Sequence, residues 1–189
     1  LYLGHSCVTT DLEDSVITAL EYFLDHGHKE IGLLVGQEET ADATPLQMDP
    51  RQRTFQQFLT EKGLYEERFV SVGQFSTESG YQMMEQLIQD LGDDLPTAFF
   101  MASDALAVGA LRSLQEHQIA IPDRVSIMSF NDTSIAKYVF PALSTVTVYT
   151  EEMGKQAIQM LRQAFQGNQP SVPYMVKLAT KLTIRDSSR

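Results

Sequence analysis

Apolar and polar positions fall into blocks along the chain, and the period of each block predicts its structure. Short, almost wholly apolar runs are typical of strands that are covered on both faces, whereas apolar positions three and four residues apart mark the inner face of a helix. The apolar runs predict strands over residues 31–35, 69–72, 98–101 and 125–130. Helical spacing predicts intervening helices that begin near residue 51, near residue 77 and at residue 104, and an earlier helix that ends at Gly27.

Strands that alternate with helices in this way form right-handed βαβ units. The pattern therefore predicts an α/β fold with a parallel sheet and helices on both faces. The first helix is preceded by Thr10 and carries Glu13, a capping-box spacing that predicts Thr10 as its N-cap.

The pattern changes after Pro141. Residues 143–148 are expected to be extended, and residues 151–166 form an amphipathic helix that a glycine and an asparagine end. Apolar and charged residues then alternate from Val176 to Ile184. A period of two predicts one final strand there, half-exposed or at the sheet edge.

Composition narrows the functional classes. The 189 residues are 43% hydrophobic, which predicts a globular core, and carry a formal net charge of −11. Such an acidic surface repels DNA phosphates, so direct binding of nucleic acid by this chain is not expected. The single cysteine, Cys7, cannot form an internal disulfide and fits a reducing cytoplasm. No apolar run is long enough to span a membrane, and no signal peptide opens the chain. Residues 1–4 resemble the end of a buried strand, so we expect a fragment of a longer protein.

Polar or aromatic residues follow the ends of the four predicted strands, and ligands of parallel sheets bind at that edge. Arg51 could donate two hydrogen bonds to ligand oxygens; the alternative is a surface pair with Asp49. Phe75 could stack on a sugar ring, or it could instead cover the start of the next helix.

The other two strand ends carry short polar residues. Ser103 and Asp104 could bind a hydroxyl group, although both residue types also favour helix N-caps. Asn131 can both donate and accept, with a cap or turn as the alternative.

The sequence lacks the patterns of a catalytic site. The four histidines are scattered, so no metal site is expected, and neither a glycine-rich phosphate loop nor a nucleophile elbow occurs. We therefore expect a binding protein that has no catalytic residue and no cofactor.

Several segments resemble, in order, those of the lactose/galactose repressor (LacI/GalR) family of transcriptional regulators. They are DHGHKEI at 25–31, RQRTF at 51–55, PTAFFMASDALAVG at 96–109, IPDRVS at 121–126, FPALSTV at 140–146, MG at 153–154 and LTIRDS at 182–187. The resemblance covers essentially the whole chain.

The resemblance implies a periplasmic-binding-protein-like (type I) effector domain of two lobes that follows a helix-turn-helix head. This chain would be mainly the C-terminal lobe, over residues 1–149. Residues 150–170 would be a helix of the N-terminal lobe and residues 171–189 the final strand and tail, with the DNA-binding head absent.

The resemblance also assigns the site. Arg51 stands where the family has a ligand-clamping arginine, and Phe75 where it has the aromatic residue that packs on the effector. Ser103 takes the place of an asparagine or glycine before Asp104. Asn131 replaces a common effector-binding aspartate, and an amide there can donate as well as accept. These five residues are the predicted effector site.

The expected function is that of a cytoplasmic, sugar-responsive repressor, here its effector-binding and dimerising part. Its partners would be a small sugar, a second copy of the chain, and operator DNA through the absent head. The helix at 104–118 and the segment after residue 131 are candidate dimer contacts. Likeness to galactose-operon and evolved β-galactosidase repressors suggests galactose or a galactoside. Two alternatives remain open at this point, a transport-type periplasmic sugar-binding protein and a flavodoxin-like enzyme.

Overall fold

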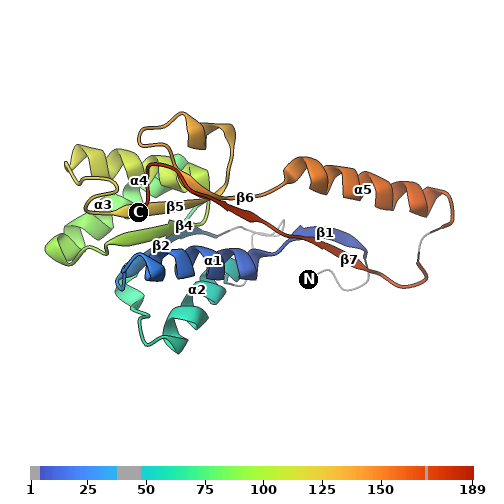
Figure 1. Ribbon diagram of the computed structural model, residues 1–189, viewed down its shortest axis with the longest axis horizontal. Helices are drawn as coiled ribbons and strands as arrows, with labels where there is room; N and C mark the ends of the chain where they lie inside the picture. The colour runs from blue at the N-terminus through green and yellow to red at the C-terminus, as the bar shows by residue number, and fades with distance from the viewer. Residues whose placement is uncertain (1–4, 38–47, 169) are drawn as a thin grey trace.

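The computed structural model describes residues 5–37, 48–168 and 170–189, and it has a layered body and a narrower arm (Figure 1). The sheet of the body has the strand order β3-β2-β4-β5-β6-β8. Its strands are β2 (Ile31–Gly36), β3 (Val70–Gly73), β4 (Ala98–Met101), β5 (Ser126–Asn131), β6 (Ser144–Thr147) and β8 (Lys181–Thr183). All neighbours pair in parallel except β6 and β8, which are antiparallel.

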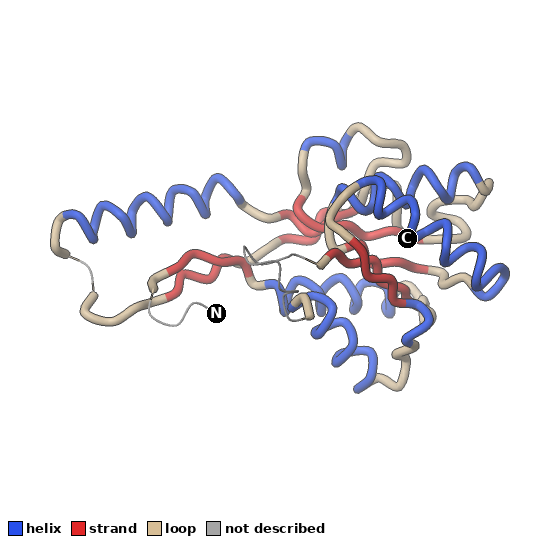
Figure 2. Tube along the Cα trace, turned by 180° about the vertical axis from the view of Figure 1, so that it is seen from behind, coloured by secondary structure: helices blue, strands red, loops and turns tan. Residues whose placement is uncertain are grey.

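Helices cover both faces of this sheet, as the alternating pattern predicts. On one face lie α1 (Leu12–Asp25) and α2 (Pro50–Glu61), and on the other α3 (Thr77–Leu91) and α4 (Asp104–Glu116), as Figures 1 and 2 show. Short 3₁₀ turns, η1 (Glu67–Phe69), η2 (Gly92–Asp94) and η3 (Ser134–Lys137), join some of the elements. The predicted α/β fold with helices on both faces is thereby confirmed.

The core lies between the helices and the central strands. Every residue of β2 and of β4 is buried, which explains why their sequences are apolar runs and do not alternate. Phe100 of β4 and Phe130 of β5 pack edge to face, with ring centroids 6.4 Å apart. The core is continuous and holds the strand ends rigidly in register.

The arm is built from segments far apart in the sequence. Strand β1 (Cys7–Thr10) pairs in parallel with β7 (Met175–Leu178), and α5 (Thr150–Phe165) extends beside them (Figure 1). No described residue of α5 is buried. Three connections join arm and body: the one from β1 to α1, the one from β6 to α5, and the one from β7 to β8.

Two local predictions are wrong. The N-cap of α1 is Asp11, whose carboxylate accepts from the backbone N–H of Asp14 at 3.2 Å. Thr10 cannot serve because it is the last residue of β1, and its hydroxyl points to the sulfur of Met153 at 3.5 Å.

The second correction concerns the final strand. The alternation from residue 176 to residue 184 belongs to two strands, β7 and β8, which lie in different sheets. A period of two identifies the exposed face of an extended segment, but it carries no information on which sheet the segment joins. The expectation for residues 1–4 lies outside the described residues. No helix in the described part of the chain is long and apolar enough to cross a membrane.

Candidate functional site

Four neighbouring strands end at one edge of the main sheet, in the order β3, β2, β4 and β5. The predicted site residues follow these ends. Phe75 comes after β3, Arg51 lies in the first turn of α2 after β2, Ser103 and Asp104 follow β4, and Asn131 is the last residue of β5. The topology therefore places all five at the carboxyl edge of the sheet, where α/β proteins bind ligands.

Arg51 occupies the centre of this edge. Its Nε and Nη2 donate to the two carboxylate oxygens of Asp49 at 2.9 and 2.8 Å, and its Nη1 donates to the carbonyl oxygen of Ala102 at 2.6 Å. The guanidinium carbon lies 4.8 Å from the ring centroid of Phe75 and 5.3 Å from that of Phe130. Both side chains of the Arg51–Asp49 pair are only 13% exposed.

The pair with Asp49 orients the Arg51 guanidinium but uses only some of its N–H donors. Asp49 is the N-cap of α2 and also accepts from the backbone N–H of Arg51 at 2.8 Å, so the helix start fixes the carboxylate. A guanidinium has five N–H donors, and three of them are used by Asp49 and Ala102. Two N–H groups, one on each terminal nitrogen, have no partner among the residues that the structure describes and could donate to ligand oxygens. The pairing with Asp49 and a binding role are therefore compatible.

Phe75 is half-buried and fills the space beside the end of β2. A Cβ placed at Gly36 would overlap the Phe75 ring and come within 2.7 Å of its backbone nitrogen. Only glycine fits there, so Gly36 lets the ring approach the strand end. In this position Phe75 supports the guanidinium of Arg51.

Ser103 and Asp104 have structural tasks at this edge. Ser103 caps α4, accepting from the backbone N–H of Leu106 at 3.2 Å. Asp104 is 2% exposed and accepts four hydrogen bonds: from the hydroxyls of Ser129 and Thr145, and from the hydroxyl and backbone N–H of Thr133. Its carboxylate thus ties α4 to β5, β6 and the loop after β5.

Asn131 lies in an unusual backbone conformation. Its φ is 108° and that of Asp132 is 55°, so two consecutive residues other than glycine have positive φ. The backbone carbonyl of Asn131 accepts from Val148 at 3.4 Å, and no hydrogen bond of its side-chain amide to another described residue occurs. The amide therefore keeps its donor and acceptor capacity.

Some residues that build this edge could not be predicted from the sequence. Phe130 supports Arg51, and the Ala102 carbonyl orients it, but an apolar core residue and a backbone oxygen leave no signal in a single sequence. Arg185, which pairs with Asp132 at 2.7 Å, lies 53 positions further along the chain. Within the described residues, no group of three or more His, Cys, Asp or Glu side chains could hold a metal ion.

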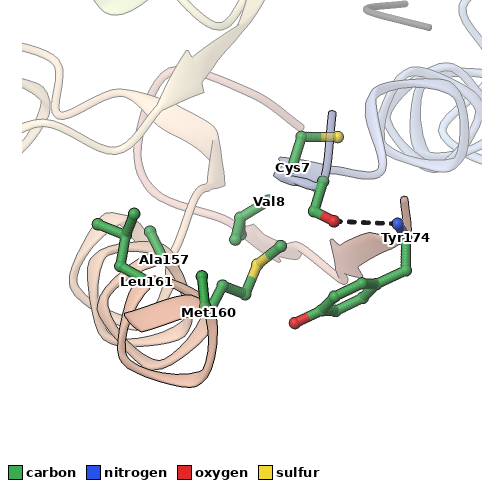
Figure 3. A pocket seen from close by; sticks show the side chains of 8 residues that line it. Cys7, Val8, Ala157, Met160, Leu161 and Tyr174 are labelled. Carbon is green, nitrogen blue, oxygen red and sulfur yellow. Dashed lines mark hydrogen bonds between the residues drawn. The ribbon is translucent and has the colours of Figure 1, made fainter. Parts of the chain in front are cut away.

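A separate apolar pocket lies in the arm, between β1, the segment before β7, and α5 (Figure 3). Its lining includes Val8, Met160, Leu161 and Tyr174. The described residues of its lining include no charged side chain, and most of them are apolar.

The chain is similar in sequence to known proteins. The family described as "Periplasmic binding protein-like domain" matches residues 20–188. The HTH-type transcriptional regulator GalR of Streptococcus thermophilus is 50% identical over 98% of the chain, and the chain covers 56% of that protein. The HTH-type transcriptional regulator GanR of Bacillus subtilis (strain 168) is 38% identical over 95% of the chain, and the chain covers 54% of it.

Solved structures share the fold. A transcriptional regulator CelR–cellobiose complex has a TM-score of 0.85 and 26% identity, covering 97% of this chain and 54% of its own. The lac repressor dimer bound to operator and the anti-inducer ONPF has a TM-score of 0.83, covering 96% and 60%; at 24% identity it supports the fold alone.

Both of these curated relatives, GalR and GanR, are transcriptional regulators, and the chain spans about half of their length. The chain belongs to the LacI/GalR family of transcriptional regulators, and its residues 20–188 match the periplasmic-binding-protein-like domain.

Proposed function

We propose that this chain is the effector-binding part of a cytoplasmic, sugar-responsive repressor. The observation that carries the proposal is the Arg51 guanidinium, held at the carboxyl edge of the sheet with two N–H groups that no described residue engages. A planar donor pair of this kind suits the vicinal hydroxyl oxygens of a sugar. Arg51 and Asn131 would bind the sugar hydroxyls. Phe75 would contact the ring and orient Arg51, and Ser103 and Asp104 would shape the edge.

The arm suggests where the rest of the site lies. A two-stranded sheet and one helix cannot form a core by themselves, so β1, β7 and α5 would belong to a second lobe. Helix α5 would then belong to that lobe, as the family resemblance implies for residues 150–170, whereas β1 would lie outside the C-terminal lobe that the resemblance places over residues 1–149. The three connections between arm and body would act as the hinge, and the sugar would bind between the lobes.

Regulation would follow from a shift in population. A sugar that binds the two lobe arrangements with different affinity favours one of them, and an attached DNA-binding head then changes its operator affinity. The helix-turn-helix regulators among the relatives support such a head in the full-length protein. A chain with a net charge of −11 requires it, because its own surface repels DNA.

Galactose or a galactoside is the effector that we propose. The support is the 50% identity with a regulator named GalR, which extends over nearly the whole chain. A second copy of the chain is the other proposed partner, supported by the side chains of Tyr138 and Phe140, which are 83% and 85% exposed on the loop after β5.

Sugar titration of the full-length protein tests the proposal. D-galactose, lactose, cellobiose and D-ribose would be titrated calorimetrically, and operator release would be followed in parallel. We expect D-galactose or lactose to bind and cellobiose and D-ribose not to bind. Binding of cellobiose alone would refute the galactoside assignment, and binding of none of the four would refute the sugar-effector proposal.

The Arg51→Ala variant tests the site itself. Because hydrogen bonds to charged groups contribute about 1.5–3 kcal/mol each, affinity should fall at least tenfold while operator binding persists. Arg53→Ala, at an exposed position of the same helix, is the matched control and should bind normally. Normal affinity in a folded Arg51→Ala variant would contradict the assigned site.

A further inference from the structure

The turn that carries Asn131 is held in a conformation that its own sequence does not favour. Asn131 and Asp132 have φ values of 108° and 55°. Asparagine and aspartate tolerate positive φ better than other residues, but two in succession are uncommon and need external support. A positive φ also changes the direction in which the Cβ leaves the strand, so this turn decides where the Asn131 amide points.

Three hydrogen bonds fix the turn through Asp132. Its two carboxylate oxygens accept from Nη2 of Arg185 at 2.7 Å and from the hydroxyl of Thr147 at 2.9 Å. Its backbone N–H donates to the hydroxyl of Thr145 at 3.3 Å. The Asp132 side chain is 10% exposed, so these bonds are largely protected from water. Of these three partners of Asp132, Arg185 is the one that carries a charge.

Arg185 is itself fixed in place. Its Nη1 donates to the carbonyl oxygen of Leu143 at 2.7 Å, and its backbone N–H donates to the hydroxyl of Ser144 at 2.8 Å. It lies two residues after the end of β8, and its side chain is only 16% exposed. The guanidinium therefore bridges the start of β6 and the turn after β5.

We propose that Arg185 is a positioning residue for the effector site, because it holds the Asn131–Asp132 turn in the conformation that aims the Asn131 amide. This inference rests on the proposed function, since it assumes that Asn131 binds the effector. Arg185 does not touch the sugar. It acts through Asp132, and Asp132 acts through the backbone of Asn131, which follows the Phe130 that supports Arg51.

A double-mutant cycle in the full-length protein tests whether Arg185 acts through Asn131, with D-galactose as the probe. The variants are Arg185→Gln, Asn131→Ala and their combination, with calorimetric affinity as the readout. We expect Arg185→Gln to weaken galactose binding about five- to tenfold in the wild-type background and less than twofold when Asn131 is already alanine. A merely structural role would give the same factor in both backgrounds.

A matched control and a milder variant accompany the cycle. Arg189→Gln removes an arginine from the same terminal segment, where it pairs with the exposed Asp123 at 2.8 Å, and should leave affinity unchanged. Thr147→Val removes the second side-chain donor to Asp132 while keeping the shape of the side chain. Thr147→Val should weaken galactose binding about two- to fivefold in the wild-type background and less when Asn131 is already alanine. This variant tests the proposal if Arg185→Gln does not fold.

The outcomes separate the two proposals. Normal galactose affinity in folded Arg185→Gln, or equal losses in both backgrounds, overturns the role of Arg185 and leaves the proposed function standing. Failure of the wild-type protein to bind D-galactose refutes galactose as the effector, and the inference falls with it.

Discussion

Asp104 and Asn131 stand at the ends of neighbouring strands, and the structure gives them opposite tasks. All the bonds of the Asp104 carboxylate are made inside the protein, to Ser129, Thr133 and Thr145. The Asn131 amide makes no such bond with another described residue. From the sequence, both residues are polar groups after an apolar strand. Their difference depends on which hydroxyls the neighbouring strands bring to each, and this is a property of the sheet.

Replacing Asp104 should therefore reduce stability more than a surface change would. In Asp104→Ala the buried hydroxyls of Ser129 and Thr145 lose their acceptor, and the exposed Thr133 loses two bonds, so we expect a loss of about 2–4 kcal/mol in the free energy of unfolding. Urea denaturation followed by circular dichroism measures the loss. Asp123→Ala, at an exposed aspartate, is the control and should change stability by less than about 0.5 kcal/mol. Equal midpoints for the two variants would contradict the structural role of Asp104.

At the scale of elements, α3 and α4 pack unusually closely. A Cβ at Gly109 of α4 would overlap the carbonyl oxygen of Thr77, and a Cβ at Gly80 of α3 would overlap that of Leu106. From the sequence, the start of α4 is a candidate dimer contact. In the structure most of this small, apolar stretch is instead buried within the chain: Leu106, Ala107, Gly109 and Ala110 are buried. Spacing alone predicts that this face is covered, but it cannot say by what.

Substituting alanine at Gly109 should force the two helices apart. The added methyl group meets backbone atoms that cannot rotate away, so we expect a loss of about 1–3 kcal/mol in unfolding free energy. Gly154→Ala is the matched control, since Gly154 lies in α5 with no other atom near its Cβ position. That change should be neutral or stabilising by up to about 1 kcal/mol, because alanine favours the helix. Thermal unfolding of both variants checks the contrast, and similar shifts would contradict it.

At the scale of the whole molecule, the most exposed large apolar side chains among the described residues lie at two places. The loop after β5 carries Tyr138 and Phe140, which are 83% and 85% exposed, next to the C-terminal half of α4. The arm exposes Phe165, 88% exposed, at the end of α5. Exposed aromatic groups of this size are typical of interaction surfaces. The first surface agrees with the segment after Asn131 as a dimer contact, and the second agrees with the proposed second lobe.

A charge placed on the exposed loop after β5 should weaken a homodimer. In Tyr138→Lys, an ammonium group would be buried at the interface between two copies, and we expect the dissociation constant to rise at least tenfold. Sedimentation velocity over a concentration series of the full-length protein measures it. Arg68→Glu, a change of charge at a half-exposed position of η1, should leave the association state unaltered. An unchanged dimer in Tyr138→Lys would place the interface elsewhere.

The sequence by itself determined the α/β class, the central strands and helices, and the edge where the site lies. These follow from hydrophobic period and from the rule that parallel strands end on a common side. Only the tertiary structure decided that residues 176–184 form strands in two sheets, that Asp104 faces inward, and that Arg185 supports the turn after β5. Each of these depends on contacts between residues distant in the chain, and local pattern carries no information about such contacts.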